Sequence, residues 1–421
     1  MKINRGCSPP WSVAVVGAGA AGLMAAIFAA SRSKRVLLLE RTRDGGRKIL
    51  ISGGGRCNIL PSTLAPERFV STAPVQVVRR MLRSWSLEGQ RRFFEQEAKI
   101  PLVLESATGK WFPASNSARQ VRDQLLALAT SKGVEVRFDS QATDIEPVID
   151  SKEWRLRFRG GEPVCARTVI VASGGLSVPA TGSDGTGLVW ARQLGHRVHS
   201  TYPALTPLVQ NPAHHAALAG VSLDVTLTAN AIGQKPFRTQ GGFLFTHQGY
   251  SGPALLNISH LAVQSQQAGG PLQPISVQWS TLDAPTWIEL LRESPGPVTA
   301  ALRRHLPARL AEALLDEDNL RGSQSSAQLR REERQHLVDK LTRYPLPWTG
   351  HEGYKKAEVT GGGVALDELD ARTLESQLHP RLFLCGEMLD VFGPIGGYNF
   401  AWAWVTGRAA GLAAAEKAGA L

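Results

Sequence analysis

Cysteine is scarce in this sequence and follows no ligand-like pattern. The four cysteines are scattered along 421 residues without a C-x-x-C pair: Cys7, Cys57, Cys165 and Cys385. A disulfide framework and a structural zinc site are therefore not expected. Such sparse cysteine usage is typical of a protein of the reducing cytoplasm, which we predict as its compartment.

The sequence also lacks a long uninterrupted apolar run. The N-terminal segment MKINRGCSPPWSVAVVGAG has no long apolar stretch and no small-residue cleavage site, so it does not match a signal peptide. Three glycines interrupt the segment VAVVGAGAAGLMAAIFAA. That pattern predicts a strand, a turn and a helix, and we expect no membrane span.

The sequence has fewer acidic residues than basic residues. Forty-seven Lys and Arg face 36 Asp and Glu, which gives a formal net charge of +11. One interpretation is a polyanionic partner such as RNA, or an acidic substrate. The other is a basic surface without a specific partner. Within residues 291–345 the cations alternate with Glu and Asp, a pattern that favours solvated, salt-bridged helix faces.

A glycine motif near the N-terminus has the context of a dinucleotide site. The strand Val13–Val16 leads into Gly17-Ala18-Gly19-Ala20-Ala21-Gly22 and a helix of small residues, and Glu40 ends the next strand. In this motif the first glycine permits a tight turn, the second lets backbone amides approach a pyrophosphate, and the third allows close helix packing. The helix N-terminus favours phosphate, and an acid about 20 residues on binds ribose hydroxyls.

The C-terminal segment favours FAD over NAD. In LFLCGEMLDVFGPIGGYNFAWAWVTG a short strand is followed by two carboxylates, Glu387 and Asp390, either of which could bind ribityl hydroxyls. Gly396-Gly397-Tyr398-Asn399 then opens a helix whose amides would face the flavin. Gly45-Gly46, trailed by Arg47-Lys48, and the strand and turn Val169–Gly175 fit a chain that wraps a long cofactor. An ordinary helix cap is the alternative interpretation of GGYN.

These patterns predict an α/β fold with a doubly wound Rossmann-type domain and two insertions. Residues 1–194 and 345–421 form the FAD-binding domain. Residues 195–284 alternate apolar and polar side chains, as in VSLDVTLTA, and predict a β-rich insertion. Residues 285–344 have helical spacing and predict a small helical insertion. Amphipathic helices are expected over residues 74–98 and 117–131.

Six further segments together resemble one family. They are GRKILISGGGRCN at 46–58, GKWFPASNSA at 109–118, ASGGLSVPATGSDGTG at 172–187, FTHQGYSGPALLNIS at 245–259, AEVTGGGV at 357–364 and CGEMLDVFGPIGGYNFAWAW at 385–404. In this order they are similar to bacterial HI0933-like or BaiN-like NAD(P)/FAD-dependent oxidoreductases. Ser173 stands where threonine is usual, and LESQ at 374–377 where MESK is usual, which suggests a separate subfamily.

The resemblance implies a two-dinucleotide-binding-domain type of FAD fold, interrupted by a β-barrel-like domain and a small helical domain. It implies FAD contacts at Gly17 to Gly22, Glu40, Arg41, Lys48 and Gly397 to Phe400, with Ala142 near the adenine. Some family members resemble reductases of conjugated C=C bonds in steroid-like ketones, and another branch resembles enzymes that reduce the uracil 5,6-bond in ribosomal RNA. Together with the residues themselves, the expected non-covalent FAD contacts are Gly17, Gly19, Ala20, Ala21, Gly22, Glu40, Arg41, Gly46, Arg47, Lys48, Arg56, Ala142, Gly174, Gly386, Glu387, Asp390, Gly397, Tyr398, Asn399 and Phe400.

Two residues are candidates for the catalytic acid that a flavin reductase needs. Tyr398 lies in the helix-opening turn, where it could donate a proton, stack against the flavin ring, or only pack and cap the turn. His247 lies in FTHQGYSGP, where it could donate a proton, bind substrate, or be satisfied within its loop. Cys57 lacks a partner cysteine in its loop and is interpreted as a packing residue. His214-His215 have no neighbouring ligand set, so no metal site is expected.

Three functions remain open at this point. The first is NAD(P)H-linked reduction of an activated C=C bond in a small molecule. The second is the same chemistry on a uracil in RNA, with the basic surface supplying affinity. The third is a flavin-binding sensor without turnover. A second dinucleotide fingerprint is missing, so NAD(P)H would dock transiently at the flavin; the oligomeric state is left open.

Overall fold

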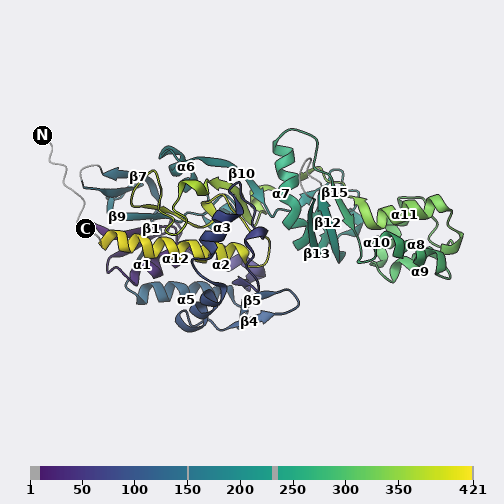
Figure 1. The fold of residues 1–421 in the computed structure, drawn as a ribbon, viewed down its shortest axis with the longest axis horizontal. Helices are drawn as coiled ribbons and strands as arrows, with labels where there is room; N and C mark the ends of the chain where they lie inside the picture. Colours follow the sequence, from purple (N-terminus) through teal and green to yellow (C-terminus); the bar gives the residue numbers. More distant parts are fainter. Residues whose placement is uncertain (1–9, 149–150, 230–235, 420–421) are drawn as a thin grey trace. The chain divides into compact units, whose positions relative to one another are not determined.

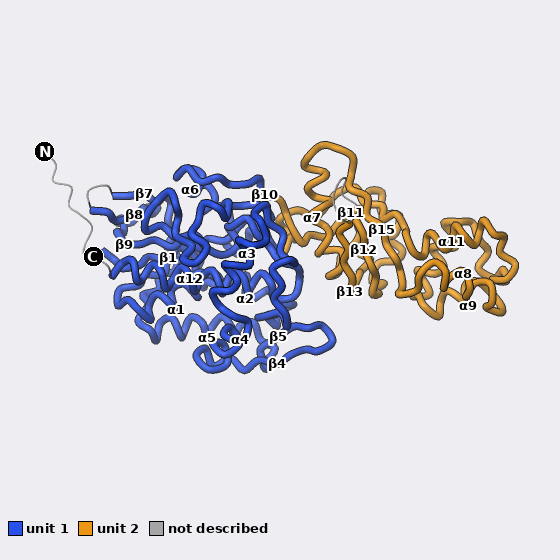
Figure 2. Tube along the Cα trace, in the orientation of Figure 1, with its two compact units in different colours: residues 1–201, 359–421 blue, residues 202–358 orange. Residues whose placement is uncertain are grey.

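The computed structural model describes residues 10–148, 151–229 and 236–419, and the chain divides into two compact units. Unit 1 comprises residues Met1–Thr201 and Val359–Leu421, and unit 2 comprises Tyr202–Glu358 (Figure 2). The units therefore meet in sequence at 201/202 and 358/359, whereas the sequence suggested 194/195 and 344/345. Cys7 lies outside the described residues.

Unit 1 is built on a twisted sheet with the strand order β6-β2-β1-β9-β8-β7, in which β19 also pairs with β9 (Figure 1). β1, β2, β6, β9 and β19 are parallel, and β7 and β8 are antiparallel. The strands are β1 (Trp11–Val16), β2 (Val36–Leu39), β6 (Glu135–Arg137), β7 (Ala142–Val148), β8 (Glu153–Phe158), β9 (Val164–Val171) and β19 (Leu382–Leu384). The order around β1 confirms the predicted doubly wound fold.

Strand β9 joins the two ends of the chain. Along one side it pairs with β1, from Ala166 opposite Trp11 to Val171 opposite Val16. Along the other side its last residues pair with β19, with Val171 opposite Leu384. The turns that follow these three parallel strands therefore lie at one edge of the sheet, where ligands bind in doubly wound folds.

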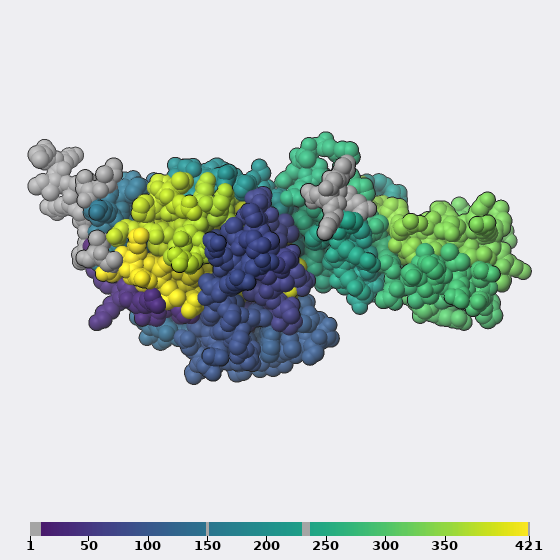
Figure 3. Space-filling model, in the orientation of Figure 1, coloured from purple at the N-terminus to yellow at the C-terminus, as the bar shows by residue number. Residues whose placement is uncertain are grey.

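The helices of unit 1 include α1 and α12, which pack side by side and against the sheet (Figure 1). On the face drawn in Figure 3, the atoms of the last helix, in yellow, lie next to those of the first βαβ unit, in purple. The helices are α1 (Ala20–Ala30), α2 (Arg47–Ile51), α3 (Val75–Leu82), α4 (Leu87–Arg92), α5 (Ala118–Ser131), α6 (Thr186–Gln193) and α12 (Tyr398–Gly419). Unit 1 also contains a small sheet of β3 (Leu60–Pro61), β5 (Lys110–Pro113) and β4 (Leu102–Glu105). A two-stranded sheet joins β18 (Val359–Val364) to β10 (Val198–Ala204), a strand that runs across the 201/202 boundary.

The helical stretch predicted over residues 74–98 is divided into separate elements. The structure has α3, then α4, and then a π-helical turn at Phe93–Glu97. Ser86 begins the second helix, because its hydroxyl accepts a hydrogen bond from the amide of Gly89 at 3.1 Å. A serine cap inside an amphipathic pattern marks a new helix, which periodicity alone does not reveal. The helix predicted at 117–131 is confirmed as α5.

Unit 2 contains a seven-stranded antiparallel sheet with the order β16-β15-β12-β13-β14-β11-β17. Its strands are β11 (Leu208–Val209), β12 (Ser222–Ala229), β13 (Phe237–Phe245), β14 (Gly249–Ser251), β15 (Ile275–Gln278), β16 (Tyr344–Pro345) and β17 (Gly350–His351). Its helices are α7 (Pro253–Gln267), α8 (Ala284–Glu293), α9 (Val298–Arg303), α10 (Ala308–Asp316) and α11 (Arg331–Arg343). The β-rich and helical segments share one hydrophobic core, in which Trp279 and Trp287 are buried, so the structure groups them in one unit.

Of the helices in the described ranges, none combines the length and apolarity needed to cross a bilayer.

The described cysteines differ in their bonding. Cys57 and Cys385 are free and buried, whereas Cys165 is disulfide-bonded. The sequence did not indicate this bond at Cys165, because the spacing of cysteines along the chain does not show which segments meet in space.

Candidate functional site

The glycine turn after β1 has the geometry of a phosphate-binding turn. Gly17 has φ +101°, and a Cβ there would lie 2.6 Å from the carbonyl oxygen of Ala172. A Cβ on Gly22 would lie 1.7 Å from the carbonyl oxygen of Gly17, so helix and turn are in backbone contact. A Cβ on Gly19 would meet no atom of the described residues within 4 Å. The turn is thus closed on the protein side and open at Gly19.

The N-terminus of α1 is free to receive an anion. Its cap residue is Gly19, and no side chain caps it within the part of the chain that the structure describes. The first amides of a helix carry partial positive charge and lack intrahelical partners. The residues present therefore fit the pyrophosphate of a dinucleotide.

Glu40 is buried at the end of β2 and faces this turn. Its Oε2 accepts a hydrogen bond from the amide of Ala18 at 2.8 Å. Its Oε1 accepts from the amide and the hydroxyl of Thr42, at 2.8 and 2.7 Å. A carboxylate has about four acceptor positions, so these three donors leave room for one ribose hydroxyl. The amide of Ser140 donates to the carbonyl of Glu40 at 2.8 Å, which brings the segment leading to Ala142 beside it.

The loop after Glu40 is held by ion pairs. Arg41 pairs with Asp184, and the Arg47 guanidinium lies 2.6 Å from the carboxylate of Asp44. Burial raises the pKa of Asp184, but hydrogen bonds from Thr186 and Arg41 outweigh burial, so its pKa is lowered. Arg41 and Arg47 are thus already engaged with protein carboxylates.

Arg122 of α5 shapes the glycine turn in the same loop. Its Nη1 donates to the carbonyls of Asp44 and Gly45, at 3.1 and 3.3 Å. Gly46 has φ +60°, and a Cβ there would lie 2.4 Å from Cγ of Arg122. Only glycine fits this crowded left-handed turn, which sets the direction of α2.

Four segments meet at the carboxyl ends of β9 and β19. The ammonium of Lys48 lies 2.6 Å from Oε2 of Glu387 and donates to the hydroxyl of Ser177 at 2.5 Å. Oε1 of Glu387 accepts from Ser177 at 2.7 Å and from Thr360 of β18. The sequence predicted Lys48 and Glu387 as site residues but missed Ser177 and Thr360. The pattern of short polar residues in ASGGLSVP and AEVTGGGV was the only signal for them.

Asp390, the other carboxylate predicted for the ribityl chain, is buried and bound to a different loop. Its Oδ2 accepts from the amide of Thr72 at 3.0 Å and from the Thr72 hydroxyl. Nε2 of His199 lies 3.9 Å from the same oxygen. Asp390 therefore fastens the loop before α3, a contact that the sequence did not indicate.

The turn that opens α12 approaches other backbone closely. Gly397 has φ +91°, and a Cβ there would lie 2.6 Å from the carbonyl carbon of Leu60. The side chain of Asn399 closes the turn, since it accepts from the amide and donates to the carbonyl of Gly393, at 2.8 and 2.9 Å. The ring of Phe400 stacks on Trp404 at 5.2 Å. In GGYN, Gly397 thus permits the close backbone approach and Asn399 stabilises the turn by hydrogen bonds.

Gly386 connects this turn region to the glycine turn after β1. A Cβ on Gly386 would lie 2.8 Å from Cβ of Ala21 at the start of α1. The C-terminal strand end and the first helix therefore touch at the proposed phosphate site. Gly174, in the turn after β9, has φ +75°, and a Cβ there would lie 2.9 Å from the Ser183 hydroxyl oxygen.

Tyr398 is buried between two side chains of the segment before α3. Its hydroxyl accepts a hydrogen bond from Arg68, whose guanidinium lies 4.7 Å from the centre of the phenol ring. Phe69 packs on the ring edge-to-face at 5.7 Å. The contact with Arg68 therefore orients the phenol group of Tyr398.

Three other residues singled out in the sequence differ in their contacts and in their burial. Arg56 donates to Glu105 at 3.1 Å and lies 3.9 Å from the centre of the Phe112 ring. Cys57 is fully buried, and burial raises the pKa of its thiol to about 12. His247 is exposed in unit 2, in the tight turn between β13 and β14. The structure thus assembles the glycine turn, Glu40, Lys48 and Glu387, whereas His247 belongs to the other unit.

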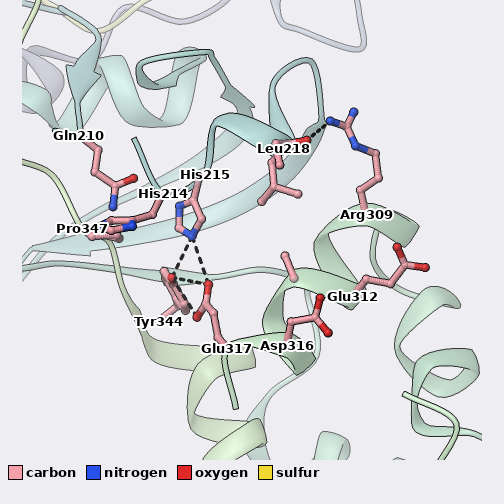
Figure 4. A pocket seen from close by; sticks show the side chains of 12 residues that line it. Gln210, His214, His215, Leu218, Arg309, Glu312, Asp316, Glu317, Tyr344 and Pro347 are labelled. Atoms are coloured by element: carbon pink, nitrogen blue, oxygen red, sulfur yellow. Dashed lines mark hydrogen bonds and ion pairs between the residues drawn. The ribbon is translucent and has the colours of Figure 1, made fainter. Parts of the chain in front are cut away.

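Unit 2 has its own recess of about 640 Å³ (Figure 4). Nδ1 of His215 lies 2.7 Å from the hydroxyl of Tyr250, and Nε2 lies 3.2 Å from Glu317. Burial, and then the charge of Glu317, raise the pKa of Tyr250 and of Tyr344. No group of three or more metal-binding side chains occurs among the described residues. This recess is lined by Gln210, His214, His215, Ala217, Leu218, Arg309, Glu312, Ala313, Asp316, Glu317, Tyr344 and Pro347.

Comparison with known proteins agrees with the motif-based resemblance. The family model described as HI0933-like protein Rossmann domain matches residues 11–413. A protein of Escherichia coli (strain K12) named ribosomal RNA dihydrouridine synthase is 33% identical over 93% of this chain and 94% of its own length. A 3-dehydro-bile acid delta(4,6)-reductase of Clostridium scindens is 29% identical over 96% of this chain and 99% of its own length.

Solved structures support the fold alone. A 3-ketosteroid-delta4-(5alpha)-dehydrogenase from Rhodococcus jostii RHA1 has a TM-score of 0.52 at 16% identity, with 98% of both chains covered. A flavocytochrome c3 fumarate reductase has a TM-score of 0.51 at 17% identity, with 98% of this chain and 79% of that chain covered. With the family model spanning nearly all of the described chain, the protein belongs to the HI0933-like family of Rossmann-type flavoproteins.

Proposed function

We propose that unit 1 binds FAD and that the protein reduces a C=C bond conjugated with a carbonyl group. The observation that carries the proposal is the glycine turn, which is closed at Gly17 and Gly22 and open at Gly19, with Gly386 of the C-terminal segment in contact with Ala21. Two segments that are distant in the sequence therefore meet beside the glycine turn, which supports the proposal. When bound, FAD supplies hydride transfer from its reduced ring.

The chain's own residues have separable tasks in this proposal. The N-terminus of α1 holds the pyrophosphate, and Glu40 holds the adenosine ribose. Tyr398, oriented by Arg68, donates the proton that completes reduction of the C=C bond. NAD(P)H is the proposed electron donor, and it would dock transiently at the flavin.

We propose a uracil in ribosomal RNA as the substrate. The 5,6-bond of uracil is conjugated with a carbonyl group, and the E. coli relative is named for making dihydrouridine in ribosomal RNA. The charge distribution favours a polyanion: unit 2 has 14 Lys and Arg against 13 Asp and Glu, so unit 1 carries +10 of the net +11. The excess of positive charge therefore lies in the unit with the proposed FAD site.

The proposed reaction is tested in the absence of oxygen. The purified protein is reduced with NADH or NADPH, and reoxidation of its flavin is followed after adding ribosomal RNA or its unmodified transcript. We expect reoxidation by RNA, with dihydrouridine detected by mass spectrometry, and RNA binding that weakens steeply as salt rises. A flavin that no nicotinamide reduces would contradict the donor, and a colourless protein that refuses FAD would contradict the proposal.

A small conjugated ketone is the second candidate. The bile-acid reductase of C. scindens is similar over nearly the whole chain and is named for reducing a steroid. An enone that reoxidises the flavin where RNA does not, with no effect of salt on turnover, would favour this substrate. A flavin that is reduced but reoxidised by neither class would favour a sensor.

A further inference from the structure

The carboxylate of Glu387 accepts four hydrogen bonds from the protein. Oε1 accepts from the hydroxyl of Ser177 at 2.7 Å and from both the amide and the hydroxyl of Thr360 at 3.1 Å. Oε2 accepts from Lys48 at 2.6 Å. Each carboxylate oxygen has two acceptor positions, so within the described chain Oε2 keeps one position open, as Oε2 of Glu40 does. The four protein donors nevertheless orient the Glu387 carboxylate without help from a cofactor.

Thr360 fixes this carboxylate to the turn after β9. Its hydroxyl oxygen accepts from the amides of Leu176 and Ser177, at 2.7 and 3.1 Å, while its hydrogen goes to Glu387. A Cβ on Gly175 would lie 2.3 Å from the same hydroxyl. Because Glu387, Ser177 and Thr360 come from three segments, their contacts leave the carboxylate one orientation.

Glu387 and Ser177 hold the ammonium group of Lys48, whose side-chain stem is otherwise flexible. Two of the three N–H groups of its ammonium point to Glu387 and Ser177. The Lys48 side chain is 26% exposed, so the third N–H can face a ligand. The cation is thus fixed beyond the carboxyl ends of β9 and β19, at the edge of the sheet where a doubly wound fold binds its ligand.

We infer that Glu387 is a positioning residue for Lys48, and that the Lys48 ammonium sets the reduction potential of the bound FAD. The inference rests on the proposed binding of FAD to unit 1. A positive charge beside a flavin stabilises its reduced, anionic form more than its oxidised form. Without the Glu387 carboxylate, the flexible lysine stem would leave the ammonium free to turn toward solvent.

The test measures the midpoint potential of FAD in the holoenzyme, which requires no knowledge of the substrate. We expect Lys48→Met to lower the potential and Lys48→Arg to keep it close to that of the wild type. Glu387→Gln removes a negative charge, which alone would raise the potential, so a lowered potential in this variant reports that the Lys48 ammonium has left its position. Matched controls are Lys417→Met and Glu375→Gln, which remove another Lys–Glu pair of unit 1 with a 3.3 Å separation. These controls should leave the potential and the visible flavin spectrum unchanged.

The outcomes separate this inference from the proposed function. If the wild-type protein does not bind FAD, the proposed function fails. If Lys48→Met binds FAD with an unchanged potential, the role of Lys48 is overturned. If Glu387→Gln loses FAD while Lys48→Met keeps both FAD and its potential, Glu387 acts on the cofactor directly and the inference is wrong. If Glu387→Gln does not fold, the comparison of Lys48→Met with Lys48→Arg still decides whether the charge of Lys48 sets the potential.

Discussion

A Cβ atom on Gly407 of α12 would lie 2.3 Å from the carbonyl oxygen of Ala21 in α1. The same relationship recurs one turn later, where a Cβ on Gly411 would lie 2.3 Å from the carbonyl oxygen of Ala25. The two helix backbones are therefore in direct contact over at least one turn. Small residues at a four-residue spacing allow this approach, and they tie the last helix of the chain to the helix that opens the proposed phosphate site.

The first prediction concerns this contact. Gly407→Ala places a methyl group against backbone that cannot rotate away, so we expect a loss of about 1–3 kcal/mol in the free energy of unfolding. The measurement is urea denaturation of the apoprotein. The control is Gly419→Ala, because a Cβ there would meet no described atom within 4 Å. A Gly407→Ala variant as stable as the wild type would mean that α12 can move away from α1.

The second prediction separates cofactor binding from folding. Gly19 has φ −77° and ψ −171°, a conformation that alanine adopts, and its Cβ position is clear of the described protein atoms. We expect Gly19→Ala to leave apoprotein stability unchanged and to weaken FAD binding tenfold or more, about 1.4 kcal/mol. Fluorescence titration with FAD and thermal unfolding give the two quantities.

Gly22→Ala is the contrasting variant. Its Cβ would lie 1.7 Å from the carbonyl oxygen of Gly17, so the apoprotein itself should lose stability. If Gly19→Ala and Gly22→Ala had the same effect on folding, the open side of the turn would not be the cofactor side.

The outline of unit 1 could be predicted from sequence because its signals are local. The helix Ala20–Ala30 was expected where it is found, since a glycine turn, a strand and a run of small residues stand together. Glu40 was expected from a fixed spacing along one βαβ unit. These patterns encode neighbours in the chain, and the family membership rests on several of them in order.

The side-chain network at Glu387 could not be predicted in the same way. Lys48, Ser177 and Thr360 are separated from Glu387 by up to 339 positions in the chain. No periodicity relates them, because their meeting depends on β19 adding to β9 and β18 lying beside the turn that follows. Likewise Arg68 has no sequence pattern that assigns it to Tyr398.

The third prediction concerns Cys57. Burial raises the pKa of this thiol to about 12, so only about one molecule in ten thousand carries the thiolate at pH 8. We expect native Cys57 to resist iodoacetamide at pH 8 and to react after unfolding, as followed by peptide mass spectrometry. Cys57→Ala should retain flavin reduction by NAD(P)H. Rapid alkylation of the native protein at Cys57 would instead indicate a reactive thiol.

The fourth prediction concerns the acid stability of unit 2. Burial raises the pKa of Glu317, but hydrogen bonds from His215, Lys340 and Tyr344 outweigh it, so the folded pKa lies below the ordinary value of 4.5. The carboxylate therefore stabilises the fold fully above pH 4.5, and this contribution disappears as pH falls through the lowered pKa. We expect Glu317→Gln to lose about 1–3 kcal/mol at pH 7 and progressively less below pH 4.5. Urea denaturation across pH 3–8 measures this difference. Glu289→Gln, an exposed glutamate without an ion pair in the described chain, should show no such pH-dependent difference, and a similar profile for both variants would contradict the role of Glu317.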